Sequence, residues 1–159
     1  KGINVVSVNP GTLFGPDIIN KKSKNTQIIN KLLNSPYYPV GTNTRITFCD
    51  VRDAATFHIL ALNINKIKHG RYIVCNTTID TKSLIKKCNM FAPNKVKVPL
   101  VYVNKKIITF GMEHVGDTNF NLLSCIEYES DFDFDNSKSK KIINYTKVDN
   151  TIADMMSSM

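Results

Sequence analysis

The hydrophobic pattern alternates between short β-branched runs and segments with helical spacing. Residues 3–9 are rich in Ile and Val and lack clean polar alternation, which is typical of a strand buried on both faces of a parallel sheet. Two further strands are predicted over residues 44–48 and 70–76. Helical spacing follows each strand, over residues 25–34, 51–66 and 81–91. This order predicts an α/β fold with parallel strand pairing.

Polar residues mark where the second and third helices begin. Asp50 is a candidate N-cap, and Asp53 lies in the first turn near the positive end of the helix dipole. Asp80 or Thr81 caps the third helix, and Pro93 closes it. Helical spacing predicts six core-facing residues in the second helix: Val51, Ala54, Ala55, His58, Ile59 and Leu62. We therefore expect His58 to be a packed helix residue and not a proton shuttle.

The second half of the chain is less regular. Residues 98–110 hold two apolar stretches that fit either strands or a kinked helix. Residues 126–136 alternate between acidic and mainly aromatic side chains, which favours a charged edge strand over a cation site, because carboxylates in a row on one strand do not converge. A short Lys-rich helix follows. A final amphipathic helix is predicted from near Asp149, with Ile152, Met155 and Met156 facing the core.

Composition and charge narrow the class of protein. Apolar residues make up 42% of the 159 positions, no apolar run reaches the length of a membrane span, and the N-terminus lacks a signal-peptide pattern. We therefore expect a soluble cytoplasmic protein without a membrane partner. The net charge of +8 comes almost entirely from scattered Lys residues, and Arg occurs only at Arg45, Arg52 and Arg71. Nucleic-acid recognition prefers Arg, so this charge favours such a partner only weakly.

The cysteines do not form a recognisable site. Cys49, Cys75, Cys88 and Cys125 are too widely spaced for a CxxC metal or redox motif, and the three His residues are equally dispersed. We expect reduced, mostly buried thiols and no metal site.

The stretch VSVNPGTLFGP, residues 6–16, carries the main chemical signal. It is a strand followed by a loop, and ligands of open α/β sheets bind at the carboxyl ends of parallel strands. Pro10 offers no backbone N–H, and Gly11 allows a ligand to approach the backbone closely. A plain turn at the end of a buried strand is the alternative.

Four segments together resemble one family. Besides VSVNPGTLFGP these are FCDVRDAATFHILAL, GRYIVCN, and FDFDNSKSKKIINY followed by VDNTIADMM. Their order and spacing are similar to the C-terminal half of an extended short-chain dehydrogenase/reductase, in the dihydroflavonol-reductase-like and aldehyde or methylglyoxal reductase branch of the NAD-dependent epimerase/dehydratase superfamily. The resemblance implies the C-terminal part of a Rossmann-type parallel sheet with a small mixed substrate-binding lobe.

The same resemblance implies roles for individual residues. Pro10 would pack against the nicotinamide ring of NADP or NAD, and the backbone of Gly11, Thr12 and Leu13 would bind its carboxamide. The stretch Asn25 to Gln27 resembles an Asn-Thr-Ser stretch that contacts cofactor phosphates, which implies Thr26 and Gln27, although Gln27 departs from the pattern and an ordinary N-cap is the alternative. Candidate substrate contacts are Phe14, Ile18 and Tyr37. The stretch from Asp50 to Asp53 is expected to fix the helix and nearby loops.

The resemblance also implies parts that residues 1–159 do not contain. Neither the glycine-rich dinucleotide loop nor the catalytic Tyr-x-x-x-Lys pair occurs at its expected place, and Tyr102 with Lys106 matches that spacing only by coincidence. We therefore expect a partial reductase domain without catalytic residues of its own, inactive alone, whose partners are an N-terminal half and a small carbonyl or alcohol substrate. The expected activity is NAD(P)H-dependent reduction of an aldehyde or ketone. Alternatives are a nucleotide-sugar epimerase or dehydratase, or a noncatalytic basic module that binds nucleic acid.

Overall fold

The fold is an α/β arrangement of short strands and helices. The computed structural model of the chain describes residues 3, 5–17, 24–34, 40–42, 44–63, 67–103 and 134–159. The strands are β1 (Val6–Pro10), β2 (Leu13–Phe14), β3 (Val40–Thr42), β4 (Arg45–Asp50), β5 (Gly70–Val74), β6 (Thr77–Asp80) and β7 (Val101–Val103). The helices are α1 (Lys24–Leu33), α2 (Val51–Ala61), α3 (Thr81–Phe91), α6 (Ser137–Lys140) and α7 (Val148–Ser158), with a 3-10 turn at Pro93–Lys95.

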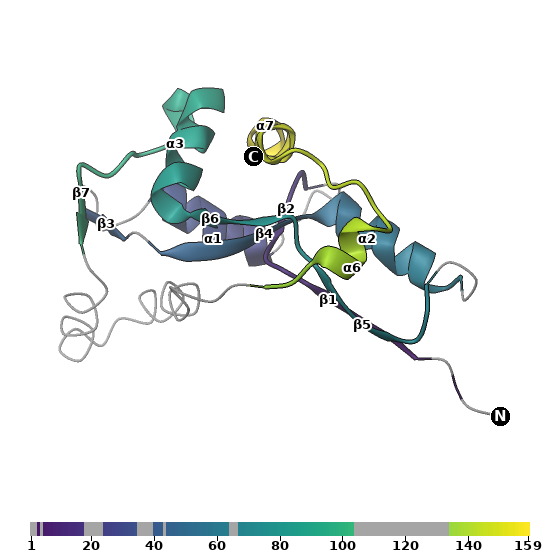
Figure 1. Cartoon of the computed structure of the whole chain (residues 1–159). Coiled ribbons are helices and arrows are strands. Elements are labelled where there is room, and N and C mark those ends of the chain that lie inside the picture. Colours follow the sequence, from purple (N-terminus) through teal and green to yellow (C-terminus); the bar gives the residue numbers. More distant parts are fainter. Residues whose placement is uncertain are drawn as a thin grey trace.

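The strands form three small sheets. β1 pairs with β5 in parallel, from Val6 opposite Gly70 to Pro10 opposite Val74. β4 lies between β2, to which it is parallel, and β6, to which it is antiparallel. β3 and β7 form a separate parallel pair, at the far end of the molecule from β1 and β5 (Figure 1). Parallel pairing of β1 and β5 confirms the sequence prediction, and the middle sheet is mixed.

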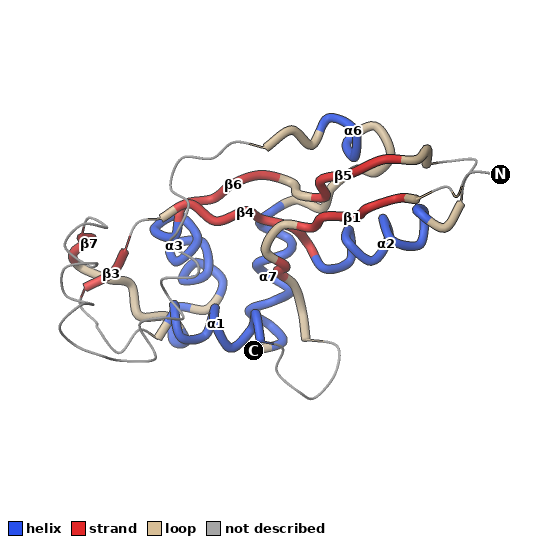
Figure 2. The backbone as a smooth tube through the Cα atoms, turned by 90° about the horizontal axis from the view of Figure 1, so that it is seen from below, coloured by secondary structure: helices blue, strands red, loops and turns tan. Residues whose placement is uncertain are grey.

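Two hydrophobic clusters hold the helices against the strands. The larger one joins α1, α3 and α7 to β4 and β6, through buried side chains that include Leu33, Phe48, Leu84, Ile152 and Met155. The smaller one joins α2 and the segment after α6 to β1 and β5, around Phe57, Tyr72, Val74 and Ile143. Figure 2 shows β1 and β5 side by side, with α6 next to β5. The smaller cluster thus places its helices along β1 and β5, the strands that carry the predicted site.

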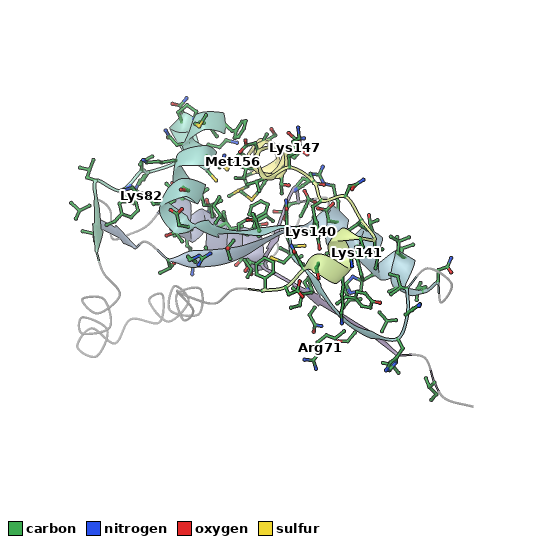
Figure 3. All side chains as sticks on the ribbon, in the orientation of Figure 1. Arg71, Lys82, Lys140, Lys141, Lys147 and Met156 are labelled. Atoms are coloured by element: carbon green, nitrogen blue, oxygen red, sulfur yellow. The ribbon has the colours of Figure 1, made fainter. Side chains whose placement is uncertain are left out.

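β1 is buried on one face and not on both. Val6 and Val8 are half-buried and pack on the smaller cluster, whereas Ser7 and Asn9 on the opposite face are exposed. Arg71, which pairs with Ser7, is exposed too and points away from the ribbon in Figure 3. The Val-rich sequence predicted two buried faces, but among the described residues only one face of this strand is covered.

The core-facing side of α2 also differs from the prediction. Its buried residues are Asp53, Ala54 and Phe57. Ile59 and Leu62 are 69% and 84% exposed, and His58 is exposed with Nδ1 2.7 Å from the carbonyl oxygen of Ala54. Of the six residues predicted to face the core only Ala54 is buried, because Asp53 and Phe57 make up the rest of the buried face.

Other predictions are confirmed where the structure describes the residues. Asp50 and Asp80 are the N-caps of α2 and α3, and Ile152, Met155 and Met156 of α7 are buried. The free thiols of Cys49, Cys75 and Cys88 are buried. Most of the predicted edge strand, together with Lys106 and Cys125, lies outside the described residues, and Phe134 to Asn136 carry no strand.

Candidate functional site

The predicted site lies at the carboxyl edge of the β1–β5 pair. Pro10 ends β1 and pairs with Val74, the last residue of β5, so the loops after both strands leave from the same edge. Pro10 is exposed there. This is the edge at which open α/β sheets bind ligands, which makes the position of Pro10 compatible with its predicted contact.

Gly11 is required by packing within the chain. Its N–H donates to the carbonyl of Val74 at 3.1 Å. A Cβ at this position would lie 2.9 Å from the Sγ of Cys75 and 3.0 Å from the Cβ of Thr47. The sequence predicts that this glycine lets a ligand approach; the structure shows that it also lets Thr47 of β4 and Cys75, just after β5, approach the loop.

The backbone of Thr12 is also engaged within the chain. Its N–H donates to the Oγ1 of Thr47 at 3.0 Å, and its carbonyl accepts from the N–H of Cys49 at 3.0 Å. Leu13, in β2, pairs with Cys49 of β4. The N–H groups of Gly11 and Thr12 therefore hold the loop in place. A cofactor carboxamide could then be bound only by other backbone atoms of this loop.

The remaining predicted contacts are scattered. Phe14 is 2% exposed and stacks on Phe48 with ring centroids 4.4 Å apart, so its ring fills the core. Thr26, in the first turn of α1, is buried and donates to a carboxylate oxygen of Asp17 at 2.8 Å, and a carboxylate there disfavours a phosphate. Gln27 is exposed. Ile18 and Tyr37 lie outside the described residues. Only Pro10 to Leu13 come together at the sheet edge, and all these roles stay predictions.

Residues from the C-terminal segment fix the end of β5. The amide nitrogen of Asn136 donates to the carbonyls of Cys75, at 2.6 Å, and Asn76, at 3.2 Å. Ser139 donates its hydroxyl to the carbonyl of Ile73 at 2.6 Å and accepts from the hydroxyl of Tyr145 at 2.8 Å. We call the hydrogen bonds of Asn136 and Ser139 to the backbone of residues 73–76, at the end of β5 and just after it, the Asn136 clamp.

The sequence did not point to the Asn136 clamp. Asn136 precedes a short Lys-rich helix, a position that is typical of a helix cap. The structure shows no side-chain cap there, and the amide instead reaches the backbone just after β5, about 60 residues earlier. The signal for this contact is structural: Asn136 and Ser139 are polar side chains that are buried, at 9% and 0% exposure.

A second network ties α7 to the start of α2. Asp50 is 1% exposed and accepts from the backbone and guanidinium of Arg52 and from the hydroxyl of Thr151 at 2.7 Å. Arg52 also pairs with Asp154 at 2.6 Å. Asp53 accepts from the backbone and hydroxyl of Thr146, both at 2.8 Å. These carboxylates are saturated by structural partners, as the sequence suggested.

Electrostatics agree with a structural role for these groups. Burial alone would raise the pKa of Asp50, but the hydrogen bonds from Arg52 and Thr151 outweigh it and hold the pKa below its usual value. Burial raises the pKa of the Cys49 thiol to about 12 and that of Cys75 to about 11. Both thiols are therefore protonated at neutral pH and unreactive as nucleophiles.

The described part of the chain lacks two kinds of feature, a cluster of metal ligands and a membrane-spanning helix. No group of three or more His, Cys, Asp or Glu side chains is arranged there to hold a metal ion. None of the helices described is both long enough and apolar enough to cross a membrane.

Comparison with known proteins gives relatives in sequence and in fold. No protein-family model matches the chain. A Candida albicans protein assigned as an NADPH-dependent methylglyoxal reductase is 39% identical over 83 residues, which cover 49% of this chain and 24% of the relative. An uncharacterised oxidoreductase of Schizosaccharomyces pombe is 31% identical over 105 residues, covering 60% of this chain and 29% of the relative.

The solved structures show the same fold. The NADPH complex of yeast methylglyoxal/isovaleraldehyde reductase matches with a TM-score of 0.64 and 24% identity, over 95% of this chain and 45% of that one. A nucleoside-diphosphate-sugar epimerase from Pseudomonas aeruginosa matches with a TM-score of 0.67 and 16% identity, over 99% and 48%. The chain thus spans less than half of each of these proteins. The chain is therefore similar in sequence to these two fungal proteins over part of its length and shares the fold of the reductase and epimerase structures.

Proposed function

We propose that residues 1–159 form the C-terminal part of an NADPH-dependent reductase that reduces an aldehyde or ketone in the cytoplasm. The observation that carries this proposal is the 39% identity to the Candida albicans reductase. The position of Pro10 at the carboxyl edge of two parallel strands supports it. The partial coverage of every relative suggests that a further, N-terminal half completes the domain and supplies the dinucleotide loop and the catalytic pair.

The residues at the edge fit one side of a nicotinamide ring. Pro10 is exposed and has no N–H, so a face of its pyrrolidine ring can pack against an aromatic ring without leaving a donor unpaired. The N–H groups of Gly11 and Thr12 are not free to bind the carboxamide, because they already donate to Val74 and Thr47. We therefore assign the ring contact to Pro10, and propose no bond from the carboxamide to those two donors.

In the proposed enzyme the cofactor supplies the hydride, and the protein orients it and manages the proton. The contribution of this chain is orientation. Pro10 would hold one face of the ring, and the hydrogen bonds behind Gly11 and Thr12 keep the loop in place. Proton transfer belongs to the proposed N-terminal half. The chain alone is therefore inactive.

The proposal is tested by expressing the chain alone and together with the coding sequence upstream of Lys1, and by following NADPH oxidation with methylglyoxal and with simple aldehydes. We expect turnover only from the longer protein. An upstream sequence without a glycine-rich strand–helix turn and without Tyr-x-x-x-Lys shortly before Lys1 would refute the proposal. NADPH turnover by the 159 residues alone would refute the assignment of the proton chemistry.

A further inference from the structure

We propose that Asn136 is a positioning residue for the Pro10–Leu13 loop and that it acts through Cys75. This inference rests on the proposed function, because the position of the loop matters to catalysis only if Pro10 contacts the cofactor. It assigns a role to a side chain that lies 126 positions after Pro10 and that touches no predicted cofactor contact itself.

The first step runs from Asn136 to Cys75. Asn136 is 9% exposed, and its amide nitrogen binds two successive carbonyls, those of Cys75 and Asn76. Two bonds from one amide fix the orientation of both peptide planes just past the end of β5. Asn76 is held further by its own side chain, which donates to the carbonyl of Thr146 at 2.8 Å. The backbone at Cys75 is therefore fixed from the C-terminal segment.

The second step runs from Cys75 to Gly11. The Sγ of Cys75 lies 2.9 Å from where a Cβ of Gly11 would be, so the sulfur packs directly against the backbone of the loop. The same thiol is placed to donate to the carbonyls of Phe48 and Thr77, both at 3.4 Å. A sulfur held by two acceptors and a fixed backbone forms a rigid support for Gly11.

The third step runs from Gly11 to Pro10. The N–H of Gly11 donates to the carbonyl of Val74, the residue before Cys75 and the partner of Pro10 in the sheet. Val74 and Cys75 therefore both contact this part of the loop, Val74 through the strand pairing and Cys75 through its sulfur. A shift of the backbone at residues 74–75 would move the peptide between Pro10 and Gly11. Because small displacements of a contact surface cost affinity, release of the Asn136 clamp is expected to weaken cofactor binding at the ring and not elsewhere.

The first test needs no cofactor and uses the full protein that contains the chain. Amide hydrogen exchange is measured in wild type, Asn136→Ala and Asn136→Asp; the last keeps the size of the side chain and loses the donor. We expect exchange at Gly11 and Thr12 to accelerate about tenfold relative to core amides of α3 in both variants. Thr151→Val is the matched control. This variant removes a buried hydrogen bond that also comes from the C-terminal segment but goes to Asp50 and not to the end of β5. Any acceleration of amide exchange should therefore be equal throughout the chain.

The second test uses the full protein that contains the chain. Titration calorimetry compares NADP⁺ with 2′-phospho-ADP-ribose, which lacks the nicotinamide. We expect Asn136→Ala to weaken NADP⁺ binding about tenfold, the equivalent of one buried hydrogen bond, and to leave 2′-phospho-ADP-ribose binding unchanged. If Asn136 variants do not fold, Cys75→Ala, which removes only the sulfur behind Gly11, should give the same pattern.

The outcomes separate the two proposals. A wild-type protein that binds neither ligand refutes the proposed function and leaves the exchange result valid. A wild type that binds both, with variants that bind and exchange like it, refutes the role of Asn136. Equal weakening of both ligands, or Asn136→Asp behaving as wild type, would show that the residue is merely structural and would also overturn the inference.

Discussion

At the scale of single residues, the loop after β1 is shaped by close contacts and not by backbone strain. Among the described residues a positive φ occurs at Gly15 and Gly70 and not at Gly11, so its small size and not its flexibility is what the fold requires. The position of Asp50 has an equally strict requirement, since a buried carboxylate is tolerated only where hydrogen bonds within the protein replace those of water. Both positions allow direct tests.

Gly11→Ala should destabilise the chain by about 1–3 kcal/mol, because the new methyl group would meet the sulfur of Cys75 and the side chain of Thr47. Urea unfolding followed by circular dichroism measures the loss. In a Gly11→Ala/Cys75→Ala double variant the sulfur that the new methyl group would meet is gone. The loss in free energy of unfolding of the double variant should therefore be smaller than the sum of the losses of the two single variants. Strict additivity would show that Cys75 does not support Gly11.

Asp50→Asn should cost roughly 1.5–3 kcal/mol at pH 7, as expected for hydrogen bonds to a charged group. Since the folded pKa of Asp50 is lowered, its carboxylate stabilises the fold above the pKa of the unfolded chain, and this contribution is lost as the pH falls through the folded value. The difference in urea midpoint between wild type and variant should therefore shrink between pH 7 and pH 3. Asp149→Asn, at an exposed pair with Lys87, is the control and should change little. A difference that stays constant with pH would contradict this account.

At the scale of elements, local signals in the sequence were sufficient for the start of α2, for both ends of α3 and for the approximate start of α7, whereas α2 ends at Ala61 and not at the predicted residue 66. Their caps and their spacing involve residues within one or two turns of each other, as with Asp80 and Ser83. The inner face of α2 could not be predicted, because it depends on Asp53 meeting Thr146, 93 positions later. The Asn136 clamp was missed for the same reason. The site was predictable as a strand end, but the contacts that hold it were not.

The packing of α7 gives a test at this scale. Ile152 is fully buried in the larger cluster, so Ile152→Ala should destabilise the chain by about 2–5 kcal/mol in urea unfolding. Ser157, one turn and a half later, is exposed and donates to the carbonyl of Ala153 within the same helix, so Ser157→Ala should stay within about 0.5 kcal/mol of wild type. Similar losses in both variants would mean that α7 does not pack as described.

At the scale of the whole molecule, two clusters share one strand. β4 contributes Ile46 and Phe48 to the larger cluster and Cys49 to the smaller one. Opening of either cluster would therefore disturb β4 and expose side chains of the other. The described part of the chain should unfold as one cooperative unit.

The buried thiols report on that cooperativity. Cys49, Cys75 and Cys88 have pKa values of about 12, 11 and 12, raised chiefly by burial, so each should react slowly with iodoacetamide in the native chain at pH 8. As urea is added, peptide mass mapping should show all three becoming reactive over the same range. Labelling of Cys75 well before Cys49 and Cys88 would indicate that the sheet edge opens on its own.

The bond between Asp50 and Thr151 also has a consequence for synthesis. Thr151 follows Asp50 by 101 positions, so on the ribosome the carboxylate and its Arg52 partner are made long before the hydroxyl and Asp154 that complete their surroundings. Until α7 emerges, burying Asp50 costs free energy, and the nascent strands must wait partly open, a state that chaperones recognise. A premature stop codon within α7 would therefore remove more than a terminal helix: it would leave the earlier part of the chain unable to close, and exposed to proteolysis.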